Sequence, residues 1–167
     1  MSQTVKGLGR PRDEEVRKRI LDSAAQLLED RCFDEITVDA IAEQSGAGKA
    51  TVYRWWPNKA AVLIEAFRER ISRELPFPDT GDFRRDVRQQ LQNFTQIIYW
   101  GRRGRVFRSF LGGALADPAI AQAFREIWIR PRRAEATKLF ERYVAEGVAR
   151  ADLDPELAVE MVFAPLY

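Results

Sequence analysis

The sequence predicts an all-α protein in which an N-terminal helix-turn-helix unit is joined by a connecting helix to a larger helical domain. Apolar residues recur at intervals of three and four along most of the 167-residue chain, and nowhere does an alternation of apolar and polar residues persist as a strand requires. A tight glycine turn separates two short helical segments between residues 37 and 59. One linker rich in proline and glycine, PFPDTG at residues 76–81, divides the chain.

Composition and charge exclude several classes of protein. The chain has one cysteine and no histidine, which excludes intramolecular disulfides and argues against histidine-based catalysis and the common zinc sites. No segment approaches the roughly 18 consecutive apolar residues of a membrane span, so we expect a cytoplasmic protein without membrane contact. The net charge of +2 is too small to indicate a nucleic-acid partner by itself. We expect no enzyme, no cofactor and no metal.

The first 58 residues are predicted to form a basic arm and a compact helical unit. Residues 1–12 lack hydrophobic periodicity and contain the basic run GLGRPR, which indicates a flexible arm. Asp13 is a good N-cap for a first helix that runs to about Arg31, with apolar residues at helical spacing. Residues 13–58 then make up the helix-turn-helix unit.

The turn itself lies between Thr37 and Lys59. The hydroxyl of Thr37 can accept a hydrogen bond from a first-turn amide, and Gly46 suits the positive φ that often follows a helix end. In the next helix Val52 and one of Trp55 or Trp56 point inward, with Trp56 the better core candidate. The residues left outside are small, polar or cationic: Lys49, Ala50, Thr51, Tyr53 and Arg54.

The remaining residues, 59–167, are predicted to form one helical domain. Asn58 can cap a connecting helix whose apolar stripe is long enough to leave the first unit. The following helices carry apolar residues at helical spacing, and Pro131 is expected to break or kink one of them. The run LAVEMVFAPLY reaches Tyr167 without a cap or stop signal, so we predict that the domain is incomplete at its C-terminal end.

The turn region also carries a family resemblance. The pattern G-x-x-x-x-T-[VL]-Y-x-x-[FW]-x-[NS]-K is present as Gly46, Thr51, Val52, Tyr53, Trp56, Asn58 and Lys59. It resembles the DNA-binding domain of the TetR family of bacterial repressors, and the resemblance covers roughly the first 75 residues. Beyond that point only the pattern of helices is similar. The resemblance implies a DNA-binding transcriptional regulator whose last two helices pair with those of a second subunit, although this chain supplies only the first of them convincingly.

These implications define a set of predicted DNA contacts, in which exposed polar groups bind phosphates and base edges. The set is Arg10 and Arg12 in the minor groove, Lys49, Ala50, Thr51, Tyr53 and Arg54 on the recognition helix, and Thr37 and Lys59 on backbone phosphates. Removing Lys59 is then expected to flatten the salt dependence of DNA binding by about one unit. The alternative interpretation is a helical hairpin at a protein interface.

Two further partners follow from the resemblance. A homodimer would place two recognition helices roughly 34–36 Å apart on a palindromic double-stranded DNA operator. A small-molecule effector of unknown identity would bind between helices of the second domain and lower DNA affinity by moving the connecting helix. Its pocket would be lined by some of the aromatic residues there, which also suit an ordinary core: Phe94, Tyr99, Trp100, Phe107, Phe110, Phe124 and Trp128.

Three other interpretations stay open. In the first, the helix-turn-helix no longer reads DNA and serves in a small-molecule sensor or a protein-interaction module. An enzyme using paired carboxylates and arginines in the second domain lacks a motif. A run of arginines is either a solvated face or an attraction for an anionic effector or more DNA backbone: Arg84, Arg85, Arg88, Arg102, Arg103, Arg105 and Arg108.

Overall fold

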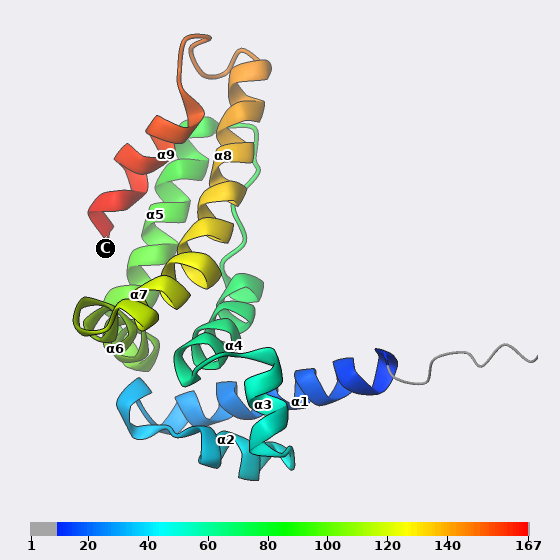
Figure 1. Cartoon of the computed structure of the whole chain (residues 1–167). Coiled ribbons are helices and arrows are strands. Elements are labelled where there is room, and N and C mark those ends of the chain that lie inside the picture. Colours follow the sequence, from blue (N-terminus) through cyan, green and yellow to red (C-terminus); the bar gives the residue numbers. More distant parts are fainter. Residues whose placement is uncertain (1–9, 167) are drawn as a thin grey trace, which may run out of the picture.

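A computed structural model describes residues 10–166, and this range contains helices and connecting turns but no strand (Figure 1). The N-terminal unit comprises α1 (Arg10–Asp30), the 3₁₀ turn η1 (Phe33–Glu35), α2 (Val38–Ser45) and α3 (Lys49–Trp55). The second part comprises α4 (Lys59–Glu74), α5 (Phe83–Tyr99), α6 (Gly101–Ala116), α7 (Pro118–Phe124), the π turn η2 (Arg125–Ile129), α8 (Arg130–Ala145), α9 (Pro155–Phe163) and the 3₁₀ turn η3 (Ala164–Leu166). The predicted all-α fold is confirmed.

The first helix begins earlier than the sequence pattern predicted. α1 starts at Arg10, three residues before Asp13. Pro11 therefore lies in its first turn, where the N–H that proline lacks would have no partner within the helix. The predicted arm of residues 1–12 is correspondingly shorter, and its first nine residues lie outside the described part of the chain.

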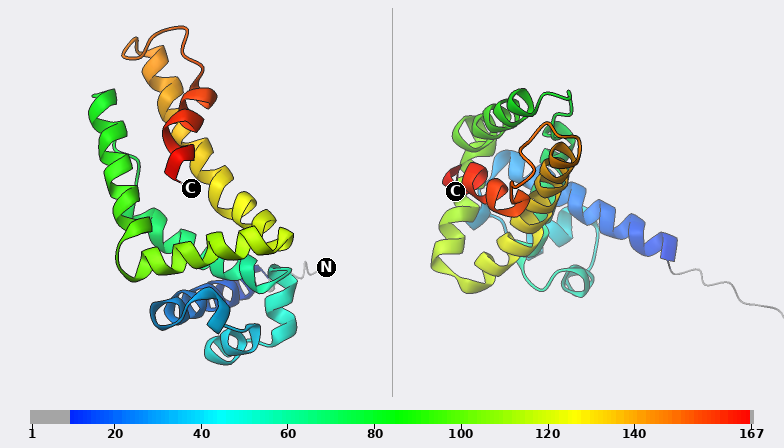
Figure 2. Two further views of the ribbon diagram at one scale, coloured as in Figure 1. Left: turned by 90° about the vertical axis from the view of Figure 1, so that its left-hand side faces the viewer. Right: turned by 90° about the horizontal axis from the view of Figure 1, so that it is seen from above.

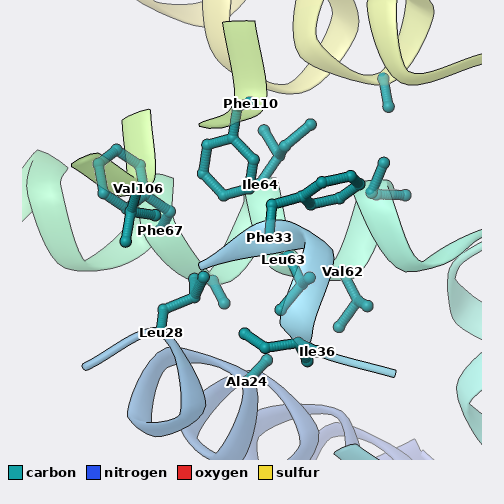
Figure 3. Packing of buried hydrophobic residues seen from close by; sticks show 14 of the residues in the cluster. Ala24, Leu28, Phe33, Ile36, Val62, Leu63, Ile64, Phe67, Val106 and Phe110 are labelled. Atoms are coloured by element: carbon teal, nitrogen blue, oxygen red, sulfur yellow. The ribbon is translucent and has the colours of Figure 1, made fainter. Parts of the chain in front are cut away.

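Helix α4 is the common core of the two parts of the molecule. Figure 3 shows Val62, Leu63, Ile64 and Phe67 of α4 between α1 on one side and α6 on the other. All four side chains are at most 6% exposed, and burying a side chain of this size contributes about 1.5–3 kcal/mol. Because one hydrophobic cluster runs through α4, the N-terminal helix-turn-helix unit and the second domain are not separated by a linker.

Helix α5 buries a different stripe from the one expected. Regular helical spacing of the apolar residues would place Phe83, Val87 and Leu91 on one inner face, but these are only half-buried. Asp86 and Gln90 are buried in their place, together with Phe94 and Ile98. The two polar residues are tolerated because both are hydrogen-bonded: Asp86 accepts from Thr80 and from the Tyr143 hydroxyl, and Gln90 bonds to Arg132.

Pro131 neither breaks nor ends the helix in which it lies. α7, η2 and α8 form one continuous curved helix, which Figure 1 shows from yellow-green to orange. Residues 125–129 adopt π geometry, and Arg130 donates to the carbonyl of Arg125, five residues earlier. The wider turn lets the chain pass the proline ring without a steric clash against the preceding turn.

The remaining helices form an open frame above α4. Figure 2 shows α5 and α8 diverging from a base made by α6 and α7, with α9 between their far ends. α9 packs on α8 and has Val159 as its buried residue. Among residues 10–166, none of the helices combines the length and the apolar character that crossing a bilayer demands.

Candidate nucleic-acid interface and cavity

The helix-turn-helix geometry follows from three residues that act locally. The Thr37 hydroxyl accepts a hydrogen bond from the Ala40 amide at 3.1 Å, which caps α2 as predicted. Gly46 ends α2 with φ at +65°, a conformation that costs glycine nothing. Val52 then points into the core and is 1% exposed. α3 is therefore held across α2, at the end of the molecule away from α8 and α9 (Figure 1).

Trp56, rather than Trp55, is the tryptophan that anchors α3. Its side chain is 3% exposed, whereas Trp55 is half-buried. The Trp56 indole donates to Glu65 of α4 at 2.6 Å, and Glu65 also forms an ion pair with Arg17 of α1. The Arg17 guanidinium lies 5.6 Å from the centre of the Trp56 ring. One carboxylate thus ties α1, α3 and α4 together behind the exposed face of α3.

The face of α3 that points away from the core carries the residues predicted to read DNA. Lys49, Ala50, Tyr53 and Arg54 are exposed and Thr51 is half-buried. Tyr53 is 47% exposed although its ring is large and apolar. A hollow of about 360 Å³ lies beside it, lined in part by Thr37, Lys49, Tyr53 and Asn58. Hydroxyl, amide and ammonium groups around a surface hollow are suited to a phosphate of the DNA backbone.

Two carboxylates that sequence reasoning missed as partners hold the cations of this face. Lys49 Nζ lies 2.9 Å from Asp39, and this hydrogen bond raises the pKa of Lys49 above its ordinary value. Arg54 lies 2.8 Å from Asp13 at the start of α1. These pairs are exposed, so each contributes little to stability and can be exchanged for a phosphate. The signal in the sequence was weak, because the partners are 10 and 41 residues apart.

Lys59 lies differently from the expectation. Its ammonium points inward, donates to the carbonyls of Phe33 and Ile36 at 3.0 and 3.1 Å, and lies 4.4 Å from the centre of the Phe33 ring. Two of its three N–H groups are therefore used within the chain. The geometry makes Lys59 a positioning residue, because it fixes the turn that leads directly into the Thr37 cap. A phosphate contact by Lys59 stays a prediction.

The proposed minor-groove residues can be placed only in part. Arg10 and Arg12 belong to the first turn of α1, but their side chains lie outside the described part of the structure. Their contact with DNA stays a prediction.

The arginine run of the sequence is not one cluster. Arg84, Arg85 and Arg88 are exposed at the start of α5, whereas Arg102 to Arg108 lie at the start of α6. Most of α5 (Phe83–Tyr99) separates the two groups, because the first lies in its opening turns and the second follows its C-terminal end. The second group is engaged locally, since Arg102 donates to the carbonyl of Leu28 and Arg108 to that of Ile98. The expectation of a single basic face is wrong.

The predicted ligand pocket is corrected in most of its residues. Phe107, Phe110, Phe124 and Trp128 are at most 3% exposed and form part of the core, in edge-to-face and tilted contacts with one another and with Phe67. Trp100 and Tyr99 point into solvent at the α5–α6 corner, where they are 74% and 54% exposed. The prediction failed for these aromatic residues because an aromatic side chain in a helix suits a buried core as well as a cavity wall. Phe94 is the one predicted residue that lines a cavity.

That cavity has a volume of about 280 Å³ and lies between α5, α8 and α9. Its apolar wall comes from the linker and all three helices: Phe77, Phe94, Ile129, Ala136, Val159 and Phe163. Its polar groups are Gln90, Arg132, Arg133 and Glu160. Sequence reasoning did not find these residues because they come from segments up to 87 positions apart, from Phe77 to Ala164. The one weak signal was Gln90, a glutamine among the apolar residues of α5.

The buried polar groups of the cavity tie it to the end of α4. Arg132 is 7% exposed and donates to the carbonyl of Leu75 at 3.0 Å. Leu75 is the C-cap residue of α4. With its amide oxygen facing Arg132, Gln90 accepts from that guanidinium at 2.6 Å and donates to the carbonyl of Pro76 at 3.2 Å. The cavity wall is thereby hydrogen-bonded to the helix that carries Lys59 at its other end.

Comparison with known proteins identifies the family to which both parts of the chain are similar. Residues 20–66 match the family described as bacterial regulatory proteins, tetR family, and residues 77–167 match the tetracyclin repressor-like C-terminal domain. The HTH-type transcriptional regulator YdeS of Bacillus subtilis (strain 168) is 37% identical over 95% of this chain and 80% of its own length. The regulator Mb1581 of Mycobacterium bovis is 30% identical over 88% of this chain and 70% of its own.

A solved structure extends the similarity to three dimensions. The TetR family transcription regulator SCO0332 superposes with a TM-score of 0.83 at 32% identity, covering 92% of this chain and 84% of its own. Members of this family are transcriptional regulators and not enzymes. Because family models match both parts of the chain and relatives of 30–37% identity cover most of it, the chain belongs to the TetR family of bacterial DNA-binding transcriptional regulators.

Proposed function

We propose that the chain is a repressor that binds a palindromic operator as a homodimer and is released from it by a small-molecule effector. The observation that carries the DNA-binding part is the exposure of Tyr53 beside Lys49 and Thr51. An exposed tyrosine between a hydroxyl and two cations has no core to serve. It is suited to a phosphate or to the methyl group of thymine.

The exposed tyrosines provide a matched test of this surface. Tyr53→Ala removes a proposed DNA contact, whereas Tyr99→Ala removes a tyrosine of similar exposure at the α5–α6 corner. The operator is identified among the fragments of bacterial DNA that the protein retains. Fluorescence anisotropy then measures the affinity of each variant for a duplex that contains it. We expect Tyr53→Ala to weaken operator binding about 5- to 150-fold, corresponding to a contact of about 1–3 kcal/mol. Tyr99→Ala is expected to leave affinity unchanged, and equal effects of the two variants would refute the assignment.

The homodimer is supported by the exposed face of α9. Leu157 and Met161 are 57% and 72% exposed, although both are apolar and one helical turn apart. A second copy of the same face would bury them, and two recognition helices are needed to read a palindrome. Analytical ultracentrifugation of Met161→Lys tests this, since a charge at the interface should shift the protein toward monomer. An unchanged sedimentation coefficient would exclude α9 from the interface.

Effector release is supported by the route from the cavity to the recognition helix. Arg132 at the cavity bonds to Leu75 at the C-terminal end of α4, and Lys59 at its N-terminal end holds the turn before α2. A ligand that displaces α8 relative to α5 would therefore move the C-terminal end of α4, and α4 would transmit the movement to the turn that Lys59 holds at its other end. TetR-family regulators bind DNA and small-molecule effectors, and binding to genomic DNA implies action in the cytoplasm.

A further inference from the structure

The cavity between α5, α8 and α9 has the size of a small two-ring molecule. An apolar cavity of about 150 Å³ accommodates benzene, which has six non-hydrogen atoms. The volume here is about 280 Å³, so by the same ratio it admits about 11 such atoms. Its walls include the rings of Phe77, Phe94 and Phe163. Flat apolar surfaces of this kind favour an aromatic or alicyclic ligand through offset and edge contacts.

The charged side chains at the cavity are already compensated within the protein. Arg133 lies 2.5 Å from Glu160 and 3.6 Å from Glu156. Arg132 lies 3.4 Å from Glu135, and its guanidinium also contacts the Leu75 carbonyl and the Phe77 ring. Each guanidinium that lines the cavity thus has a carboxylate within 4 Å, and the lining carboxylate has a guanidinium.

We propose that this cavity binds an uncharged, predominantly apolar molecule of about two fused rings. The inference rests on the proposed effector role and names the chemical class of the ligand. A ligand with its own charge would bring an unmatched charge against apolar walls, or would have to separate Arg133 from Glu160. Either event costs free energy that a neutral ligand of the same shape does not incur.

Isosteric probes separate charge from shape. 2-Naphthamide and 2-naphthoate have the same rings and nearly the same volume, but only the second carries a charge at pH 7. Each has 13 non-hydrogen atoms, slightly more than the roughly 11 that fill the cavity by volume, and the partly open cavity leaves room for the difference. Isothermal titration calorimetry on the full chain, without DNA, measures both. We expect 2-naphthamide to bind at least ten times more tightly than 2-naphthoate. Equal affinities, tighter binding of the carboxylate, or no saturable binding of either probe would overturn the proposal.

Two variants locate the binding and test the reason for it. Ala164 lines the cavity but is exposed, so Ala164→Trp should obstruct the cavity without disturbing the core. The matched control is Ala145→Trp, because Ala145 is also exposed, at the end of α8, and does not line the cavity. We expect the first to abolish 2-naphthamide binding and the second to preserve it. Binding that survives Ala164→Trp unchanged lies elsewhere and refutes the site.

The charge argument has its own variant. Glu160→Gln removes the nearest partner of Arg133 and changes shape little. We expect the affinity for 2-naphthoate to rise severalfold while that for 2-naphthamide stays within about twofold, so that the gap between the probes narrows. An unchanged gap would show that compensated charge does not determine the selectivity. These titrations contain no DNA, so failure of effector release leaves their outcome intact, and failure of DNA binding is detected by the Tyr53→Ala experiment.

Discussion

Replacing Lys59 with methionine isolates the inward role that the structure gives this residue. The substitution keeps an unbranched chain but removes the ammonium that donates to the Phe33 and Ile36 carbonyls. Hydrogen bonds from a charged donor contribute about 1.5–3 kcal/mol each, and contact of the ammonium with the Phe33 ring adds about 0.5–2 kcal/mol. Because Lys59 is half-buried and water replaces part of these contacts, we expect the free energy of unfolding to fall by about 2–3 kcal/mol. Tm should fall by roughly 4–12 °C, at about 2–4 °C per kcal/mol.

The effect on DNA binding distinguishes positioning from direct contact. If Lys59 only fixes the turn before Thr37, Lys59→Met lowers operator affinity by about 5- to 30-fold, for roughly 1–2 kcal/mol of ordering. The slope of log K against log salt concentration then stays unchanged. A lost phosphate contact lowers the magnitude of that slope by about 0.9, and by about 1.8 for a dimer. Anisotropy titrations between 50 and 200 mM salt measure it.

Lys49→Met is the matched control for this experiment. Lys49 is exposed and paired with Asp39, so its loss should leave the free energy of unfolding within about 0.5 kcal/mol. The salt slope should nevertheless fall, because Lys49 lies on the face of α3 that approaches phosphates. A Lys59→Met variant with wild-type stability and a reduced slope would refute the positioning role and restore the sequence-based expectation.

Three other predictions concern local stability. Burial alone would raise the pKa of Asp86, but hydrogen bonds from Thr80 and Tyr143 outweigh it and hold that pKa below the ordinary value of 3.8. The stabilisation by these hydrogen bonds is therefore present above about pH 4 and is lost as the pH falls through the lowered pKa of Asp86. Denaturant titration should show the largest difference in stability between wild type and Asp86→Asn at neutral pH and a smaller one in acid. A difference that does not change with pH would contradict a lowered pKa for Asp86. Thr37→Ala should cost about 1 kcal/mol and Thr37→Ser much less, because only the serine keeps a capping hydroxyl; equal losses in thermal unfolding would exclude the cap. Gly46→Ala should cost about 1–2 kcal/mol. The added Cβ would meet no other atom within 4 Å, so this cost comes from backbone strain at positive φ alone. Gly112, which lies within a helix and is equally uncrowded, is the control: Gly112→Ala should stabilise the protein by about 0.5–1 kcal/mol.

The sequence predicted best what local chemistry determines. The Thr37 cap, the turn at Gly46 and the inward Val52 each depend on residues within one or two turns of helix, and all three are confirmed. The exposure of Tyr53 follows from the same spacing.

The cavity and the orientation of Lys59 could not be predicted in this way. Both depend on groups that meet only after folding: Lys59 binds carbonyls 23 and 26 residues earlier, and Arg132 binds one 57 residues earlier. On α5 the apolar pattern also failed, because Asp86 and Gln90 are buried through hydrogen bonds that hydrophobic periodicity cannot register.

The π turn at residues 125–129 has a consequence for the evolution and engineering of this chain. The π turn at Arg125–Ile129 places five residues in roughly the rotation that four residues make in a regular α-helix, so the additional residue is absorbed and α8 keeps the side that it presents inward. Deleting one residue from this turn would restore regular pitch and leave Arg132, Ala136 and Phe140 facing the same way. The same deletion in α7, where the pitch is already regular, would rotate everything that follows by roughly 100° and turn a whole wall of the cavity.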